Sequence, residues 1–313
     1  MLVYIIKRLF ATIPVMAVVA VVVFMLLRLT TGDPAAIIAG DSGTSQDVEA
    51  IRAKLGLDRP IVEQFGIWIA KVVRGDFGES FFFKRSVASL IVERVEPTLA
   101  LATLTLVLTV AMAVPLGVIA AWKRGTWIDR GVMGLSVLGF SVPVFVIGYV
   151  LIYLFAIQLG WFPVQGYQRL AEGFGGFLER LILPSFTLSV IYVALIARIT
   201  RASVLEVLEA DHVRTARAKG LPELPVLVRH VLRNAAVPIV TVIGLGVALL
   251  IGGVVVTESV YAIPGLGRLT VDAVLARDYP TVQAVILLFS VVYVVINLCV
   301  DLTYTFLDPR IRY

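Results

Sequence analysis

Few side chains in this chain have the types and spacing that acid–base, nucleophilic or metal chemistry requires. The two histidines, His212 and His230, lie eighteen positions apart with no cysteine near them, which is not the spacing of a zinc site. Because Cys299 is the only cysteine, no disulfide can form within the chain. The sequence also lacks a G-x-x-x-x-G-K-S/T phosphate-binding loop and a G-x-S-x-G nucleophile turn. We therefore expect no catalytic residue, no metal site and no cofactor bound by this chain.

The stretch that stands out is 211–220, DHVRTARAKG, a compact basic segment between two long apolar runs. Apolar positions within and before it recur at helical spacing: Val204, Leu205, Leu208, Val213 and Ala216. Gly220 follows basic residues, as glycines at helix ends often do, and Pro222 prevents continuation of the helix. The pattern predicts a short helix, a sharp stop and a second helix from about Pro225.

A rigid helix of this kind, held along a membrane surface, is typical of a docking element. The alternative is a plain basic loop that faces the membrane, but such a loop does not need a helix with a glycine stop. We therefore take this segment as a candidate contact for a partner protein. Its candidate residues are Asp211, His212, Val213, Arg214, Thr215, Ala216, Arg217, Lys219, Gly220 and Leu221.

The elements that position this segment are predicted to be membrane-spanning helices. Hydrophobic residues make up 59% of the chain and charged residues only 16%, whereas a soluble domain carries about a quarter charged residues. Six windows free of Asp, Glu, Lys and Arg approach the roughly 20 residues of a spanning helix: 9–27, 98–121, 132–157, 181–197, 235–257 and 282–300. We expect an all-α polytopic membrane protein with six transmembrane helices and an extended external segment after the first one.

Basic residues are concentrated on one side of this predicted bundle. Thirteen Lys and Arg lie in the segments 1–8, 122–131, 201–236 and 307–313, against four in the loops 158–180 and 258–281. The excess of positive charge in short loops marks the cytoplasmic side, so both termini are expected in the cytoplasm. The net charge of +5 thus reflects membrane topology rather than binding to nucleic acid.

The predicted parts begin with a cytoplasmic N-terminus and first transmembrane helix at 1–29, followed by an external helical segment at 30–97. A core of five transmembrane helices spans 98–306 and includes the cytoplasmic loop 201–236. A cytoplasmic C-terminus occupies 307–313.

Within the external segment, one short helix is expected to end around Gly56, and another, at about 86–95, to lead into Pro97. Between them, apolar residues recur on one face of a further predicted helix: Ile61, Phe65, Trp68, Ile69 and Val72. That face can pack on the outer ends of the spans or lie in the interfacial layer of the bilayer. The segment is accordingly either a structural cap or a docking surface.

Charged residues that border the spans are Arg28, Arg198, Glu258 and Asp301. Because each lies near a span end, we interpret them as snorkelling or as paired in a local salt bridge. The predicted spans contain no stack of carboxylates at mid-depth that would form an ion relay. This absence counts against an ion-coupled transporter. Prolines within the windows, such as Pro143, favour a bundle of bent helices.

The run RTARAKG resembles the version of the EAA loop carried by permease subunits of ATP-binding-cassette (ABC) importers. Ala216 and Gly220 match the second alanine and the glycine of that motif. Arg214 and Thr215 stand in place of its glutamate and first alanine. Further along, Leu232 falls at the motif's leucine, with an arginine in place of its proline.

These departures resemble the dipeptide/oligopeptide (peptide/nickel) group of such permeases, and similarity extends over essentially the whole chain. The other similar segments are YIIKRLFATIP…FMLLRLTTGDPA, LGLDRPIVEQFGIWI…GDFGESF…VEPTLALA, SVPVFVIG, TESVYAIPGLGRLTVDAVLARDYPTVQA and NLCVDLTYTFLDPRIRY.

The resemblance implies a type I ABC importer permease in the bacterial inner membrane, a binding-protein-dependent component. Its expected partners are a second, homologous permease subunit in a heterodimer, two cytoplasmic ATPase subunits that bind ATP and Mg, an extracytoplasmic substrate-binding protein and the lipid bilayer. The candidate residues at 211–221 would then contact an ATPase and couple it to the spans.

The function that the resemblance implies is to form half of a translocation pathway for di- and oligopeptides. The alternatives are the same importer class carrying nickel chelates, glutathione or other small solutes, a membrane scaffold outside this class, and an ion-coupled transporter. The residues that bind substrate are not legible from the sequence.

Overall fold

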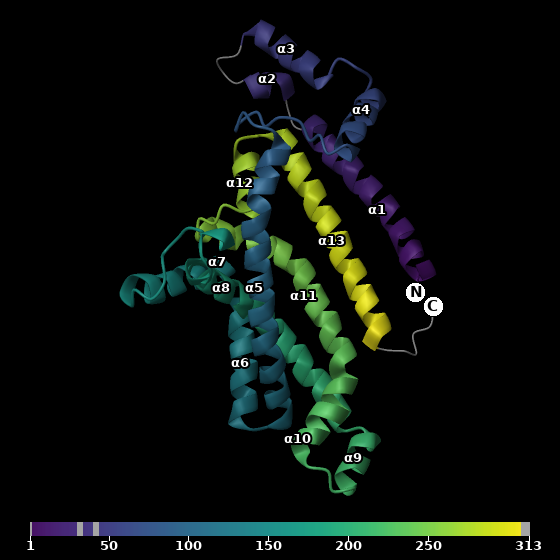
Figure 1. The fold of residues 1–313 in the computed structure, drawn as a ribbon, viewed down its shortest axis with the longest axis vertical. Coiled ribbons are helices and arrows are strands. Elements are labelled where there is room, and N and C mark those ends of the chain that lie inside the picture. Colours follow the sequence, from purple (N-terminus) through teal and green to yellow (C-terminus); the bar gives the residue numbers. More distant parts are fainter. Residues whose placement is uncertain (1, 30–33, 40–43, 308–313) are drawn as a thin grey trace. The chain divides into compact units, whose positions relative to one another are not determined.

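The computed structural model describes residues 2–29, 34–39 and 44–307. These residues fold almost entirely into helices, and an isolated bridge joins Glu79 to Ser86. Figure 1 shows these helices in chain order, and they divide into two compact units. Unit 1 comprises Met1–Glu96 with Arg268–Val295, and unit 2 comprises Pro97–Gly267 with Ile296–Tyr313. The all-α class expected from the sequence is confirmed.

In the described part of the chain, four helices are long and apolar enough to cross a membrane. They are α5 (Val87–Trp122), α8 (Phe174–Leu208), the run Glu223–Val260 that ends with α11 (Arg233–Val260), and α13 (Tyr279–Leu307). The helix α1 (Leu2–Leu29) adds a shorter apolar stretch, Phe10–Leu26. Together with a bent pair of helices, these elements account for all the predicted windows, while the count of six spans stays a prediction.

The third predicted span is divided in two. The helix α6 (Trp127–Ser141) meets α7 (Val144–Leu151) and the π-helical segment η1 (Ile152–Gln158) at an angle of 105°. Pro143 causes the break, because it has no N–H group to donate and keeps the preceding Val142 extended, with φ −96° and ψ 126°. The pair forms either one broken span or a re-entrant loop.

Besides α1 and parts of α5 and α13, unit 1 contains short helices: α2 (Pro34–Ala39), α3 (Ser45–Leu55), α4 (Ile61–Val73) and most of α12 (Leu266–Leu275). The helix α3 begins with a capping box, in which Thr44 and Asp47 each accept a hydrogen bond from the other's backbone N–H. Hydrogen bonds from the Thr44 hydroxyl and N–H lower the pKa of Asp47. The helix ends at Gly56, as predicted, where φ is +64°.

The amphipathic face of α4 packs against α1. The Phe24 ring of α1 lies 5.1 Å from that of Phe65 and 5.5 Å from that of Trp68, measured between centroids. Aromatic pairs of this kind contribute about 0.5–1.5 kcal/mol beyond their buried area. Two alternatives were predicted for this face: packing on the spans or lying in the interfacial layer. Phe65 and Trp68 pack on a predicted span, whereas Ile61 on the same helix is exposed.

The helix α5 runs without interruption from Val87 through Pro97 to Trp122. The prediction of a separate helix at 86–95 is therefore wrong. Val87 and Leu90 are fully buried. Packing thus keeps the residues before the proline helical, although the proline removes one backbone hydrogen bond.

A buried carboxylate fixes the turn around Ser80 to the start of α13 in unit 1. The Asp278 carboxylate accepts hydrogen bonds from Ser80 Oγ at 2.5 Å, from Phe81 N at 3.0 Å and from Thr281 Oγ1 at 2.6 Å. Asp278, Ser80 and Thr281 are all buried. Because hydrogen bonds meet both carboxylate oxygens, this charge is stabilised where an unpaired one would be costly.

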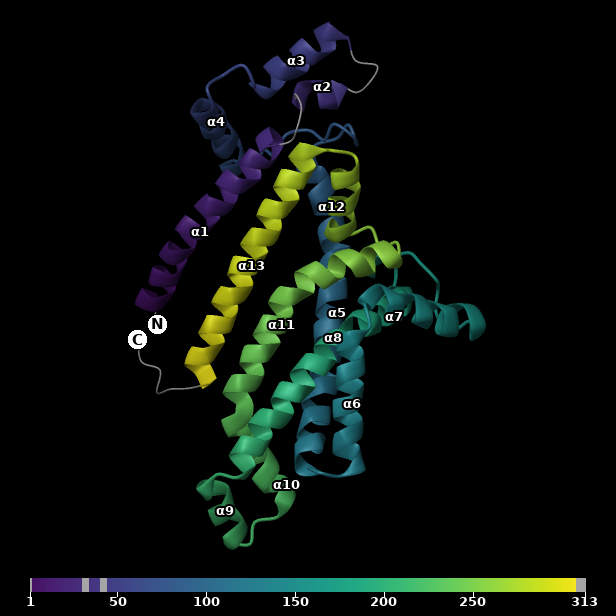
Figure 2. The same ribbon diagram turned by 180° about the vertical axis from the view of Figure 1, so that it is seen from behind.

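In unit 2, α8 packs along α11 and α6 (Figure 2), and α5 also contacts α8. Gly117 of α5 allows one of these close approaches, since a Cβ at that position would lie 2.6 Å from both the Ala197 carbonyl oxygen and Thr200 Cβ. The turn between α5 and α6 lies at the same end of unit 2 as α9 (Asp211–Ala218) and α10 (Glu223–Pro225) (Figures 1 and 2).

Glu258 is fully buried near the end of α11, so interpreting it as a snorkelling side chain is wrong. Its Oε1 accepts a hydrogen bond from Thr98 Oγ1 at 2.6 Å, and Thr98 Oγ1 in turn accepts one from Leu266 N at 2.8 Å. A side chain added at Gly265 would overlap the carboxylate. The loop after α11 therefore folds back over Glu258 and removes it from solvent and lipid.

Candidate functional site

The candidate segment forms its own helix, α9, which begins after a break in the chain. The helix α8 ends at Leu208, and Ala210, in extended conformation, precedes α9. Asp211 lies in the first turn of α9 and Arg217 in the last, the placement that the helix dipole favours. The predicted short helix is confirmed, but the apolar positions at Val204, Leu205 and Leu208 belong to α8.

Two of the candidate residues attach α9 to the rest of unit 2. Val213 and Ala216 are buried in an apolar cluster that also contains Ala121, Val204, Val226, Leu227, Val231, Ala235 and Ile239. Burying one valine side chain contributes about 1.5–3 kcal/mol. The cluster joins α9 to the ends of α5, α8 and α11, so α9 is packed on the bundle and is not a free loop.

Gly220 ends α9 with a backbone conformation that favours glycine. Its φ is +79°, its N–H donates to Arg217 O at 2.9 Å, and Leu221 N donates to Ala216 O at 3.4 Å. This pair of hydrogen bonds is a Schellman motif, which satisfies the last carbonyl groups of a helix. A Cβ at Gly220 would meet nothing within 4 Å. Backbone conformation, and not space, therefore requires the glycine.

The other candidate residues of this segment face solvent: Asp211, His212, Arg214, Thr215, Arg217, Lys219, Gly220 and Leu221. Arg217 is held in a two-point ion pair with Glu223, at 2.9 and 3.1 Å. Thr215 Oγ1 donates to Asp211 O at 2.9 Å within the helix. The exposed face of α9 is thus polar and mostly basic, with an ordered guanidinium near its C-terminal end.

The second predicted helix starts at Glu223, two residues before the predicted Pro225. It runs through α10 and a π-helical segment, η3 (Val226–Leu232), into α11. Asn234 Nδ2 donates to His230 O at 2.6 Å and lies 3.4 Å from His212 Nε2. This contact ties the first turn of α9 to the first turn of α11.

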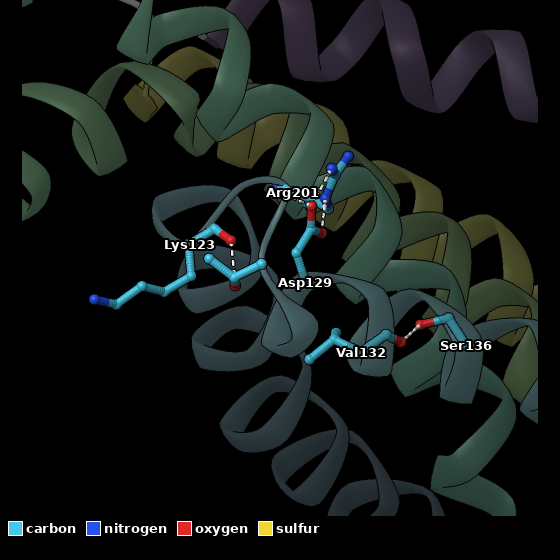
Figure 3. Close-up of polar contacts among 7 residues, drawn as sticks. Lys123, Asp129, Val132, Ser136 and Arg201 are labelled. Atoms are coloured by element: carbon cyan, nitrogen blue, oxygen red, sulfur yellow. Dashed lines mark hydrogen bonds and ion pairs between the residues drawn. The ribbon is translucent and has the colours of Figure 1, made fainter.

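Sequence reasoning missed an ion pair next to this site. Asp129 in the first turn of α6 accepts hydrogen bonds from Arg201 of α8, at 2.5 Å from Nε and 2.8 Å from Nη2 (Figure 3). The Asp129 side chain is almost fully buried. In the sequence, Asp129 is distinguished as the single acidic residue of the basic segment 122–131. That feature does not identify its partner, which lies 72 positions away.

An apolar cavity of about 360 Å³ lies in unit 2 between α5, α6, α7 and α8. Its lining includes Met112, Leu116, Leu135, Ile147 and Val190. Ser136 also lines it, but its hydroxyl donates to Val132 O of the same helix at 2.9 Å (Figure 3). The cavity offers dispersion contacts rather than polar recognition. Among the described residues, no group of three or more His, Cys, Asp or Glu is placed to bind a metal ion.

Residues 113–313 match the family described as binding-protein-dependent transport system inner membrane component, and residues 1–102 match the N-terminal model of such membrane components. The chain belongs to this family of ABC importer permeases. Its membership confirms the resemblance first seen in the EAA-like run and in the motifs along the chain. The permease is accordingly a multi-pass component of the inner membrane.

Two curated relatives resemble this permease over its whole length. The probable peptide ABC transporter permease protein of Sinorhizobium fredii (strain NBRC 101917 / NGR234) is 54% identical over 311 residues, which cover 99% of each chain. The glutathione transport system permease protein GsiC of Escherichia coli (strain K12) is 46% identical over 313 residues, which cover 100% of each chain.

A solved structure shares the fold of this permease. It is a chain from the inward facing conformations of the MetNI methionine ABC transporter, with a TM-score of 0.58 at 19% sequence identity. The match covers 70% of this chain and 96% of that one. At this identity the likeness concerns the fold alone.

Proposed function

We propose that this permease forms half of the translocation pathway of an ATP-driven importer of di- and oligopeptides. The observation that carries the proposal is that the chain is 54% identical, over 99% of its length, to a protein named for peptide transport. Both are related to binding-protein-dependent permeases. The structure contributes α9, a short helix with one buried apolar face, one exposed polar face and a fixed end.

ATP and Mg are bound by two separate ATPase subunits in the cytoplasm, and α9 contacts one of them. Its exposed face, with Arg214, Arg217 and Lys219, provides the contact, while Val213 and Ala216 anchor α9 to the bundle. Closure of the ATPase pair displaces α9 as a rigid body. The apolar cluster passes this displacement to α5, α8 and α11, and the bundle alternates between inward- and outward-open states.

The complete importer contains a second, homologous permease and an extracytoplasmic substrate-binding protein. Both termini of this chain lie in the cytoplasm, as the bias of Lys and Arg toward one set of loops supports. The segment 30–97 and the loop that covers Glu258 lie on the opposite side, where they receive the binding protein and its cargo.

Glutathione is the second candidate substrate. The observation that favours it is the 46% identity to the glutathione permease of Escherichia coli over 100% of both chains. Glutathione is itself a tripeptide with an unusual γ-linkage, so a peptide pathway and a glutathione pathway require similar chemistry.

Uptake by whole cells separates these substrates. A strain with the importer deleted is complemented with the wild-type gene cluster or with the cluster lacking this permease, and supplied with labelled dialanine, trialanine or glutathione. We expect the wild-type cluster, but not the cluster that lacks this permease, to restore ATP-dependent uptake of dialanine or trialanine. Uptake of glutathione alone would replace the peptide assignment, and uptake of none of these substrates would contradict it.

A further inference from the structure

The turn between α5 and α6 is fastened to α8 by a carboxylate that is almost fully buried. The Asp129 carboxylate accepts two hydrogen bonds from the Arg201 guanidinium, and its Oδ2 accepts a third from Gly125 N at 3.0 Å. The side chains of Asp129 and Arg201 are 6% and 24% exposed. Charge-assisted, two-point pairs of this kind are stronger and more directional than single hydrogen bonds. One carboxylate therefore orients both its own turn and the end of α8.

A second ion pair joins the same turn to the residue at which α8 gives way to α9. Arg124 Nη1 lies 2.7 Å from Glu209 Oε1, and both side chains are more than half exposed. Glu209 caps α8 and directly precedes Ala210, the residue before α9. An exposed pair adds little to stability, but this one lies at the corner where displacement of α9 begins.

An apolar contact completes the connection. Ala121, at the end of α5, is buried in the same cluster as Val213 and Ala216 of α9. The α5–α6 turn thus meets the α8–α9 corner through an apolar contact and the Arg124–Glu209 pair, and it meets α8 about two turns earlier through the Asp129–Arg201 pair. The residues in contact are far apart in the sequence, and the elements that carry them, the α5–α6 turn and α9, lie at the same end of unit 2 (Figures 1 and 2).

We propose that Asp129 and Arg201 are positioning residues that make the α5–α6 turn move together with α9. This inference rests on the proposed contact between α9 and an ATPase. The pair delivers the displacement of α9 to α6, a helix that the α9 cluster does not reach. Removing Asp129 leaves the half-buried Arg201 charge without its partner and frees the turn from α8. The exposed pair Arg124–Glu209 holds the same turn at the start of α9.

The test uses the whole importer, purified through a tag on this chain, in a Cys299→Ser background. Lys123→Cys reports the turn through its rate of maleimide labelling, because Lys123 is exposed in that turn. Lys219→Cys reports contact between α9 and an ATPase through crosslinking. We expect ATP and Mg to change the labelling rate at position 123. In Asp129→Asn this change should fall by about twofold to about thirtyfold, the range found for mutations along coupling networks, while the crosslink persists.

Matched variants separate positioning from a general loss of structure. Ser136→Ala removes a hydrogen bond within the same helix, α6, and leaves both ion pairs, so the ATP-dependent change should equal that of wild type. Arg124→Glu should reduce the change, and Arg124→Glu combined with Glu209→Arg should restore it, because the exchange rebuilds the exposed pair with opposite polarity.

An unchanged ATP response in Asp129→Asn, with the crosslink present, would overturn the positioning role of this pair and leave the α9 contact intact. Absence of the crosslink in the wild-type complex would overturn the α9 contact and the positioning role together. If Asp129→Asn does not reach the membrane, Arg201→Lys decides the question, because it keeps the charge beside Asp129 but loses the two-point hydrogen bonding of the guanidinium; a wild-type ATP response in Arg201→Lys would overturn the positioning role.

Discussion

Gly220 shows how one residue sets the end of the candidate coupling helix. Its φ of +79° lies in the region that L-residues with a side chain rarely adopt, while the space around it is open. Sequence predicted this glycine as a helix end because basic residues precede it and Pro222 follows. Its local signals suffice because a Schellman motif is a local structure.

Substituting Gly220 tests whether its conformation matters for coupling. Gly220→Val should raise the conformational energy by about 1–3 kcal/mol, loosen the end of α9 and lower the substrate moved per ATP hydrolysed. Gly220→Asn should be close to wild type, since asparagine tolerates positive φ. The ratio of uptake to ATP hydrolysis in reconstituted vesicles measures both. Equal ratios in the two variants would contradict a conformational role.

Other residue contacts could not be predicted, because their partners are distant in the sequence. Asp129 and Arg201 are 72 positions apart, and Thr98 and Glu258 are 160 apart. The pattern around Glu258 indicated only a charge near a span end. Its burial depends on the loop that folds back after α11, and hydrophobic periodicity carries no information about that fold.

At the scale of elements, the attachment of α9 by its buried face is the main structural requirement. Val213→Asp places a carboxylate in an apolar cluster, where an unsatisfied buried group costs about 1–3 kcal/mol or more. We expect α9 to detach, so that trypsin cleaves after Arg214 and Arg217 about fivefold faster or more, at 1.4 kcal/mol per factor of ten. Mass spectrometry of the fragments measures this.

Val228→Asp is the matched control, because Val228 lies in the neighbouring segment η3 with its side chain more than half exposed. Its cleavage rate should equal that of wild type. Resistance of Val213→Asp to trypsin at the wild-type level would show that α9 does not depend on this anchor.

The elements themselves could largely be predicted, and Pro143 was expected to bend a helix, but how strongly each proline would interrupt its helix could not be predicted. Pro97 was expected to separate two helices and lies inside α5, whereas Pro143 divides a window expected to form one span. Both prolines lack the N–H group, so the local chemistry is the same. At Pro97, tertiary packing keeps the preceding residues helical, since Val87 and Leu90 are buried, whereas at Pro143 the preceding Val142 takes the extended conformation that a following proline favours.

At the scale of the whole molecule, composition and charge distribution predicted a polytopic membrane protein, and motifs along the chain predicted its family. Substrate could not be predicted in the same way. The cavity between α5, α6, α7 and α8 is apolar, and its residues carry no signature of a peptide or of any other solute. The proposed substrate class therefore rests on the names of relatives that match the full length of the chain.

The central claim is that α9 contacts an ATPase and couples it to the spans. Lys219→Cys is the right probe, because Lys219 is exposed while the neighbouring Ala216 is buried. In a Cys299→Ser background, it is oxidised together with an ATPase subunit that carries a single cysteine. We expect a disulfide crosslink whose yield changes with ATP. No crosslink in any nucleotide state, in a complex shown to be assembled, would contradict the coupling role of α9.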